Sequence, residues 1–422
     1  MARRVLLISA EYPPMPGGIG DYTALLAAHL AESGATVAVL TTGNGTVRHD
    51  EDVTVYERTP SWGWCSVNTV HGVMRFFRPD IVHLQYQTGM YGMHPAINFL
   101  PDRLAWHTPI VRPRTPRKAF HLHTSCDYHF VTTFHDLRHP YLFPKAGPLR
   151  AWVTRHLACA SSVAIGTNGA DVALLRKWRA NGTLIPIGSN IPPASVRDPQ
   201  AIRARYGIPA NAPLLTTFGL LNQSKGVETV IDTLAMLRRE EMNAHLLLIG
   251  AGAGLSDPTN RATEATVDRQ CAAGGLTAFV HRTGPLPAAA VAEALAASDV
   301  CVLPYRDGAS PRRGSLLAAL TQGIPVVTTT PAPAVYDGLP AFRDGEVARC
   351  VPTGDARAIV GAVQAILRDD LLAARLRAGA AAYAERFTWP AIATQMLALY
   401  DTLGVMAAEA ITGPVVASGV ER

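Results

Sequence analysis

The amino-acid sequence predicts an α/β protein with two doubly wound, Rossmann-like domains, each built on a parallel sheet. Short apolar runs rich in β-branched residues alternate with helical stretches along the chain, which is the pattern of βαβ units. The pattern starts again after about residue 197, and 422 residues exceed what one hydrophobic core usually holds. Two domains that face each other across a ligand cleft explain the chain better than one very large sheet.

The first half of the chain predicts one complete α/β layer. Its first strand, RVLLIS at residues 4–9, is followed by a helix at 21–34 that a glycine closes, and by a strand at 36–42. Further buried strands are expected in this half at residues 80–85, 129–136, 161–167 and 182–190. We therefore expect a first domain over residues 1–195.

The second half repeats the pattern. Strands are expected at residues 214–220, 245–252, 278–284, 300–305 and 325–330, with helices between them such as 226–240 and 287–298. Residues 355–404 are expected to be helical with one break at Pro390. The expected second domain covers residues 196–385, a last helix covers 386–404, and a flexible tail covers 405–422.

Composition and charge describe a globular chain. Hydrophobic residues make up 48%, charged residues make up 17%, and the formal net charge is +5 at pH 7. This mild basicity suits anionic ligands or a membrane surface, and no finger or RNA-binding signature indicates nucleic acid as a partner. No segment reaches the roughly 18 apolar residues of a spanning helix, and the apolar run at the start is too short for a secretory signal.

Cysteine spacing and one basic segment bear on location. The six cysteines are widely separated and form no CxxC pair, which is typical of a reduced, cytosolic chain. Residues 107–120 carry four Arg or Lys and no acid. A solvated loop explains this segment, and contact with an anionic membrane or acceptor is the alternative. We therefore expect a cytoplasmic protein, with peripheral contact at the inner membrane face left open.

Three stretches place polar or flexible residues at the ends of predicted strands. EYPPMPGGIGDY brings Gly17, Gly18 and Gly20 to a helix start, where backbone N–H groups could approach a ligand, although a plain tight turn explains them equally. His135 and Asp136 end a buried strand, at the edge where such sheets bind ligands. Lys225 lies beside the next helix start and suits a phosphate group.

The stretch SPRRGS places adjacent cations before a helix. Arg312 and Arg313 are unexpected there, because a helix start is the positive end of the helix dipole. Either this is a solvated turn, or an anion binds there with help from the N–H groups of Gly314 and Ser315.

Metal binding is not expected. His121, His123, Cys126 and His129 match no closed zinc spacing. The acidic triplet at residues 50–52 is better explained as a solvated turn than as a site for a metal–nucleotide.

Taken in order, these segments resemble the family 4 glycosyltransferases of the GT-B fold over roughly residues 3–403. The motifs that carry the resemblance are EYPPMPGGIGDY, VTTFHDL, GLLNQSKG, HLLLIGAG, HRTGPLP, ASDVCVLP, GIPVVTT, RDGEVARCVPTGD and ERFTWPAIATQMLALY. The resemblance implies a sugar transferase, mostly retaining and without a required metal or other cofactor. It implies a nucleotide-sugar donor, linked to UDP or GDP, in the second domain and the acceptor in the first, with the last helix crossing back to the first domain. The acceptor class, whether carbohydrate, lipid-linked or small molecule, stays open.

The resemblance also implies roles for individual residues. His135 would contact the donor sugar, Gly17 and Gly18 would contact the sugar or phosphate, and Lys225 would neutralise the leaving diphosphate. Further candidates for contact with donor sugar or acceptor are Asp21, Tyr86, Gln87, Asp136 and Ser310.

The chain departs from the family at three charged positions. The family's diphosphate arginine falls on Leu220, and its Glu-x7-Glu motif falls on Ser310 and Ala318. We therefore expect Arg312 or Arg313 to supply the missing cation, while Asp307 is offset from a direct replacement for a lost acid. A nucleotide-sugar epimerase and a non-catalytic relative that binds a sugar or partner remain as alternatives, and a nicotinamide-dependent dehydrogenase lacks its fingerprint.

Overall fold

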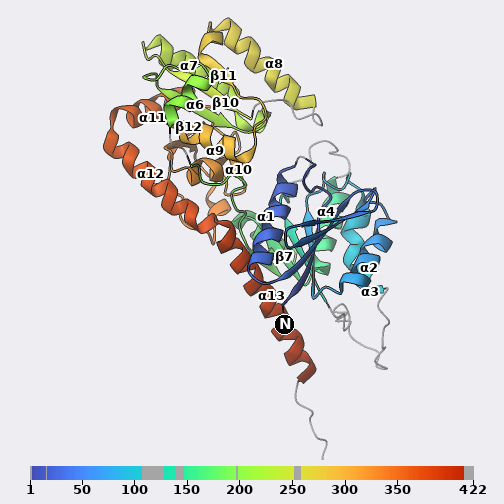
Figure 1. The fold of residues 1–422 in the computed structure, drawn as a ribbon. Coiled ribbons are helices and arrows are strands. Elements are labelled where there is room, and N and C mark those ends of the chain that lie inside the picture. Colours follow the sequence, from blue (N-terminus) through green and yellow to red (C-terminus); the bar gives the residue numbers. More distant parts are fainter. Residues whose placement is uncertain are drawn as a thin grey trace, which may run out of the picture. The chain divides into compact units, whose positions relative to one another are not determined.

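The computed structural model describes residues 2–15, 17–106, 128–137, 147–195, 198–250 and 258–412. The chain divides into two compact units (Figure 1). The N-terminal unit comprises Met1–Thr167, Asp171–Ile185 and Trp389–Arg422, and the C-terminal unit comprises Asn168–Ala170 and Pro186–Thr388. Two parallel-sheet units confirm the predicted fold class.

The chain enters the C-terminal unit at Pro186, earlier than the boundary expected after residue 195. The reason is apolar packing, since Ile187 and Ile191 both pack against a core cluster of the C-terminal unit. Gln322 adds polar contacts from the same unit, accepting a hydrogen bond from the Ala194 N–H at 2.8 Å. Sequence periodicity does not report such long-range contacts.

The N-terminal unit is built on an eight-stranded sheet with the order β3-β4-β2-β1-β5-β6-β7-β8. The strands are β1 (Arg4–Ile8), β2 (Thr36–Thr42), β3 (Thr46–Asp50), β4 (Val53–Thr59), β5 (Ile81–Tyr86), β6 (His129–Phe134), β7 (Val163–Gly166) and β8 (Gly182–Leu184). Among the strands that the structure describes in this unit, β3 and β4 form the one antiparallel pair. The acidic triplet at residues 50–52 ends β3 and forms the turn of this hairpin.

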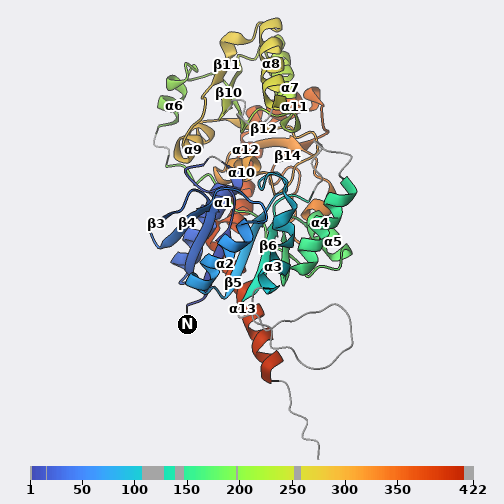
Figure 2. The ribbon, with the colours of Figure 1, turned by 90° about the vertical axis from the view of Figure 1, so that its right-hand side faces the viewer.

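Helices cover this sheet on both faces. They are α1 (Gly18–Glu32), α2 (Ser66–Phe77), α3 (Leu100–Trp106), α4 (Gly147–Ala160), α5 (Gly169–Lys177) and α13 (Trp389–Thr412), with the 3-10 helix η1 (Pro95–Phe99) before α3. The first helix packs against α13, whereas α2, α3 and α4 lie side by side (Figure 2).

The C-terminal helix α13 is anchored in the N-terminal unit by a buried histidine. His83 of β5 is fully buried, with Nδ1 2.6 Å from the Tyr400 hydroxyl and Nε2 2.7 Å from Thr133 Oγ1. Burial lowers the pKa of His83 to about 3, with a smaller contribution from His135. The ring is therefore neutral, and one ring nitrogen donates while the other accepts.

The C-terminal unit has a six-stranded parallel sheet with the order β11-β10-β9-β12-β13-β14. Its strands are β9 (Leu214–Phe218), β10 (His245–Ile249), β11 (Val280–Arg282), β12 (Val300–Leu303), β13 (Val326–Thr329) and β14 (Arg349–Val351). Its helices are α6 (Pro199–Arg205), α7 (Val227–Arg239), α8 (Pro258–Ala273), α9 (Ala288–Ala296), α10 (Gly314–Thr321), α11 (Ala356–Arg368) and α12 (Asp370–Ala384). Four 3-10 helices complete it: η3 (Gln223–Lys225), η4 (Thr277–Phe279), η5 (Pro333–Tyr336) and η6 (Glu385–Phe387).

Alternate side chains of these strands face two separate apolar cores. On β10, Leu246 and Leu248 join one buried cluster, and Leu247 and Ile249 join the other. This two-sided burial is what a doubly wound sheet requires, and it explains why the strands read as continuous apolar runs.

The helical end of the chain differs from expectation in three places. The break expected at Pro390 lies just before it, at the 3-10 helix η6 and Thr388, and Pro390 is the second residue of α13, because proline is tolerated in the first turn of a helix. An additional break lies at Asp369, whose side chain caps α12 by accepting the Leu372 N–H at 3.0 Å. The last helix continues to Thr412, beyond the expected start of a tail at residue 405.

Across the residues described, no helix combines the length and the apolar character needed to span a bilayer.

Removing the Tyr400 hydroxyl should destabilise the N-terminal unit. In Tyr400→Phe, a buried ring nitrogen of His83 loses its partner, which typically costs about 1–3 kcal/mol. Hydrogen exchange of the β5 amides should report this loss, and the β9 amides should be unaffected. Gln395→Ala, an exposed position on the same helix, is the matched control, and an equal loss there would contradict the proposed anchor.

Candidate active site

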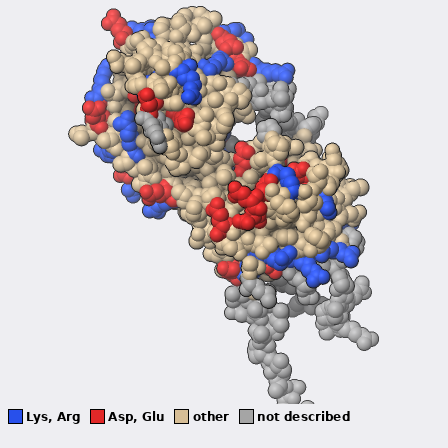
Figure 3. Space-filling view, viewed as in Figure 1, with Lys and Arg blue, Asp and Glu red and all other residues tan. Residues whose placement is uncertain are grey.

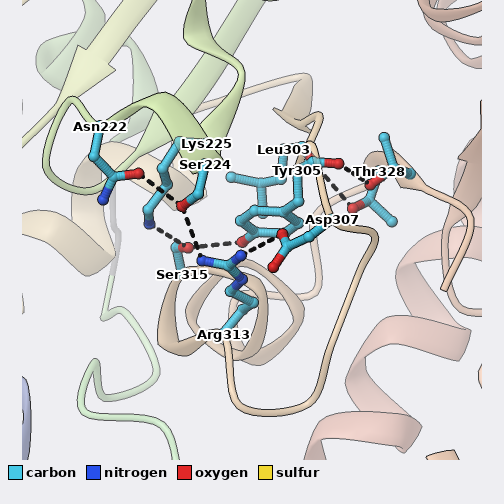
Figure 4. A network of polar contacts seen from close by, with 10 residues as sticks. Asn222, Ser224, Lys225, Leu303, Tyr305, Asp307, Arg313, Ser315 and Thr328 are labelled. Atoms are coloured by element: carbon cyan, nitrogen blue, oxygen red, sulfur yellow. Dashed lines mark hydrogen bonds and ion pairs between the residues drawn. The ribbon is translucent and has the colours of Figure 1, made fainter. Parts of the chain in front are cut away.

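A polar cluster lies at the carboxyl ends of β9 and β12 in the C-terminal unit (Figure 4). Lys225 ends the 3-10 helix η3 that follows β9, and Tyr305 and Asp307 follow β12. Arg313 and Ser315 come from the start of α10. The structure thus brings together Lys225, Arg313, Gly314 and Ser315, which the sequence placed in one candidate site.

Gly226 explains how Lys225 reaches this edge. It has a φ of 65°, and a Cβ there would overlap the carbonyl oxygen of Pro304 at the end of β12. Glycine therefore permits the loop after β9 to lie directly on the loop after β12. The Arg306 N–H holds the same contact by donating to the Ser224 carbonyl at 3.0 Å.

The Lys225 ammonium is buried and bound by neutral groups. Its Nζ donates to Ser315 Oγ at 2.8 Å and to the Phe218 carbonyl at 3.3 Å. The same Ser315 Oγ lies 2.7 Å from the hydroxyl of the fully buried Tyr305. Within the part of the chain that the structure describes, no carboxylate lies at ion-pair distance from Lys225.

Burial, with a smaller contribution from the nearby Arg313, lowers the pKa of Lys225 to about 8. Both effects disfavour the charged form of the lysine, because desolvation and a like charge each raise its free energy. A bound anion would relieve both. The site therefore holds positive charge that its own residues do not neutralise.

Arg313 contributes the second cation. Its Nη1 donates to Ser224 Oγ at 3.3 Å, its Nη2 pairs with Asp307 Oδ1, and its guanidinium carbon lies 4.9 Å from the centre of the Tyr305 ring. Only 14% of its side chain is exposed. Its neighbour Arg312 is half-buried.

The first turn of α10 opens toward this cluster. Arg313 is the N-cap residue, and its side chain makes no capping hydrogen bond. Gly314 is exposed and Ser315 is buried. Uncapped N–H groups at a helix start attract anions. The two positions where the resemblance implied glutamates hold the uncharged Ser310, which is 5% exposed, and Ala318, which is fully buried in an apolar core.

In the N-terminal unit, the side chain of Glu11 lies against the glycine turn at residues 17–20, and the sequence analysis did not identify this acid. A Cβ on Gly17 would overlap a carboxyl oxygen of Glu11, whereas one on Gly18 would meet nothing within 4 Å. Burial raises the pKa of Glu11, a hydrogen bond from the Gly20 N–H opposes this, and Asp21 raises it again. Burial also raises the pKa of Asp21. The position of Glu11 in the loop that follows the first buried strand was the available signal.

The β3–β4 hairpin holds this turn in place. Arg48 donates from Nη2 to the Pro13 carbonyl, and its guanidinium carbon lies 5.4 Å from the centre of the Tyr12 ring. Its Nε donates to Glu57 Oε1 at 2.8 Å, which fixes the arginine to β4.

His135 lies beside the start of α1 and is uncharged. Its ring is 4.7 Å from the Tyr22 ring, and its Nε2 lies 3.0 Å from Gln85 Oε1. Burial lowers the pKa of His135 to about 3. Because Gln85 Oε1 is an acceptor, Nε2 carries the proton of the neutral ring, and Nδ1 is left with acceptor character.

The other candidates of this unit occupy different surroundings. Asp136 is half-buried and Gln87 is exposed. Tyr86 lines a cavity of about 140 Å³ together with Leu149 and Arg150, and its hydroxyl accepts from Asn98 Nδ2 at 2.8 Å.

Some sequence-based candidates lie outside the described residues. These are His121, His123 and Cys126, the basic segment 107–120, and the part of the glycine run after Gly250. Across the described ranges, no group of three or more His, Cys, Asp or Glu could hold a metal ion.

The buried charge of Lys225 should make stability depend on pH. Between about 8 and 10.5 the unfolded chain binds more protons than the folded chain, so wild-type stability should rise with pH in this window. Lys225→Met removes this charge, whose desolvation costs about 3 kcal/mol at pH 7, so its stability advantage over wild type should shrink across the window. Hydrogen exchange of the β9 amides measures the difference.

The exposed Lys177→Met is the matched control and should leave the pH profile unchanged. A constant difference between wild type and Lys225→Met from pH 7 to 10.5 would contradict the lowered pKa.

Comparison with known proteins gives the family. The model for "Glycosyl transferase 4-like domain" matches residues 17–188, and the model for "Glycosyl transferases group 1" matches residues 212–369. The chain is 29% identical over 268 residues to a phosphatidyl-myo-inositol mannosyltransferase from Mycobacterium leprae, which covers 61% of this chain and 62% of the relative. It is 30% identical over 213 residues to a D-inositol 3-phosphate glycosyltransferase from Nocardioides sp., covering 48% and 44%. The chain thus spans less than two thirds of these relatives' lengths.

Solved structures show the same fold. A sucrose-phosphate synthase from Thermosynechococcus elongatus matches with a TM-score of 0.73 and 21% identity, covering 96% of this chain and 100% of the other. The HepE protein from Anabaena, in complex with UDP-glucose, matches with a TM-score of 0.69 and 16% identity, covering 95% and 99%. With both units matched in order, the chain belongs to the group 1 (family 4) glycosyltransferases of the GT-B fold.

Proposed function

We propose that the protein transfers a sugar from a nucleotide-sugar donor to an acceptor hydroxyl. The observation that carries this proposal is the convergence of buried Lys225, Arg313 and the uncapped start of α10, which together form a cradle for a diphosphate. Relatives named as mannosyl- and glycosyltransferases support transfer over the alternatives of an epimerase or a non-catalytic protein.

The C-terminal unit would bind the diphosphate of the donor. Lys225 Nζ, the Arg313 guanidinium and the N–H groups of Gly314 and Ser315 would neutralise the charge that develops on the leaving group. Ser315 would orient the lysine, because its hydroxyl already accepts from Nζ. A structural neighbour binds UDP-glucose, which supports a nucleotide-sugar donor, and both UDP- and GDP-linked sugars remain candidates.

The N-terminal unit would bind through a neutral histidine, backbone groups and two acidic side chains. With a pKa of about 3, His135 would stay uncharged at neutral pH. Its Nδ1 would accept a hydrogen bond from a sugar hydroxyl. The backbone of Gly17 and Gly18 would approach the same ligand. The carboxylates of Asp21 and Asp136, together with Gln87 and the Tyr86 cavity, would contact the acceptor or the donor sugar.

We propose transfer with retention of the anomeric configuration and without a metal ion. Two side-chain cations would stabilise the departing diphosphate, and the acceptor hydroxyl would attack from the same face of the sugar. The acceptor class, whether carbohydrate, lipid-linked or small molecule, stays open. The free thiols of Cys65, Cys159, Cys271, Cys301 and Cys350 support a cytoplasmic location.

Nucleoside diphosphate binding tests the cradle. Affinity for UDP or GDP should fall about tenfold per pH unit above about pH 8, because the free Lys225 must take up a proton before it pairs with the anion. Calorimetry in two buffers of different ionisation enthalpy should show that uptake. Lys225→Met should weaken binding at pH 7 by at least about tenfold and abolish the pH dependence.

The same binding measurement shows which of Arg312 and Arg313 contacts the diphosphate. Arg313→Gln should weaken binding by about tenfold, with Arg312→Gln measured beside it. Unchanged binding in Arg313→Gln would remove Arg313 from the proposed site.

A matched glycine pair tests transfer itself. Gly17→Ala places a Cβ against the Glu11 carboxyl group and should slow acceptor-dependent release of nucleoside diphosphate by at least about tenfold, since small misplacements cost large factors in rate. Gly18→Ala meets no neighbour and should lose clearly less.

Proton NMR of the product in this assay reports the anomer. An inverted product would overturn retention, and equal losses in the two variants would overturn the role of the glycine turn. Nucleoside diphosphate release that needs no acceptor would count against transfer.

A further inference from the structure

We infer that the N-terminal unit docks on an anionic lipid bilayer through the outward faces of α2, α3 and α4. This interaction goes beyond the proposed sugar transfer and does not require it. The three helices lie side by side in one layer over the sheet (Figure 2). We call their outward surface the Trp/Arg face, and its residues are Trp64, Arg75, Phe76, Arg103, Leu149, Trp152 and Arg155.

Large apolar side chains are exposed on the Trp/Arg face. The exposed fractions are 47% for Trp64, 80% for Phe76, 65% for Leu149 and 54% for Trp152. Trp64 lies just before α2 and Phe76 lies in its last turn, while the other two lie in the first half of α4. Helices of a soluble protein normally turn such residues inward, so their exposure just before α2, on α2 and on α4 points to a partner.

The aromatic rings from separate elements form a continuous strip. The ring centre of Phe99 lies 6.1 Å from that of Trp64 and 5.9 Å from that of Trp152. The Arg103 guanidinium carbon lies 5.4 Å from the centre of the Trp64 ring. Tryptophan beside arginine suits the boundary between lipid headgroups and acyl chains, where one part of the side chain is wet and the other is apolar.

The charge of the Trp/Arg face is almost entirely positive. Its three helices contain a single acid, Asp102, whose Oδ2 lies 2.9 Å from His156 Nε2. Arg75, Arg103 and Arg155 are exposed. In Figure 3, Lys and Arg side chains border the edge of this unit where Figure 1 places α2 and α3, whereas Asp and Glu gather on the side of α1.

This charge distribution favours a bilayer over a second copy of the chain. A two-fold contact through the Trp/Arg face would bring arginines against arginines, with little acid to pair them. Anionic headgroups supply the missing negative charge, and the exposed rings and Leu149 would enter the interface beside them.

Vesicle co-sedimentation tests this inference on the full chain. Binding to vesicles of phosphatidylglycerol and phosphatidylcholine should exceed binding to pure phosphatidylcholine by at least about tenfold and should fall as salt is raised. The salt dependence is measured on the wild type, so it needs no variant that has to fold. Equal binding to both vesicles, or no binding to either, would overturn the inference.

Variants locate the surface. Trp64→Ser combined with Trp152→Ser should weaken binding by at least about tenfold, and Arg75→Gln and Arg155→Gln by about fivefold each. Leu371→Ser is the matched control, because Leu371 is 85% exposed on α12 of the other unit. Circular dichroism checks that each variant is folded, and an equal loss in the control would overturn the assignment.

Two further readouts separate the alternatives. Sedimentation velocity without lipid should show the same oligomeric state for wild type and the tryptophan variant, and a change would identify the face as a contact between copies and overturn the inference. Nucleoside diphosphate affinity, measured on the same samples, should be unchanged. A failure of vesicle binding therefore does not contradict the proposed sugar transfer, and a failure of sugar transfer does not contradict the bilayer contact.

Discussion

The interaction on which the C-terminal unit's site depends is the hydrogen bond from the buried Lys225 ammonium to Ser315. A desolvated cation without a counter-ion is costly, so the protein must hold it with several neutral acceptors at once. Those acceptors come from the end of β9 and the start of α10, and Tyr305 after β12 fixes the serine. One hydroxyl therefore determines how two strand ends and a helix start are arranged.

The same principle, burial of a titratable group, acts with the opposite result in the N-terminal unit. His83 and His135 are both held neutral by desolvation, and each is fixed by a neutral partner. A neutral ring orients a ligand or a helix without attracting a stray anion. Burial therefore leaves two uncharged histidines in the N-terminal unit and a cation without a carboxylate partner in the C-terminal unit.

Sequence periodicity predicted most strands of both sheets, but not β3, β4 or β14, and it predicted one half of the site. Buried parallel strands form unbroken apolar runs, and polar residues directly after them mark the ligand edge, which is how His135 could be found, whereas Lys225 was found from its place beside a helix start. Glu11, Ser224 and Tyr305 were not predicted, because their importance comes from contacts with residues far away in sequence. Strand β3 was not predicted because an edge strand that is largely exposed carries no clear apolar pattern.

Helix α13 has a consequence for biosynthesis. It leaves the ribosome after every other helix that the structure describes, yet it packs against α1 and supplies the partner of a histidine at the centre of the first sheet. The C-terminal unit is almost continuous in sequence and can complete its core as soon as it is translated. The N-terminal unit is translated first but completed last, so during synthesis its open α1 surface is the part of the nascent chain most in need of protection from aggregation.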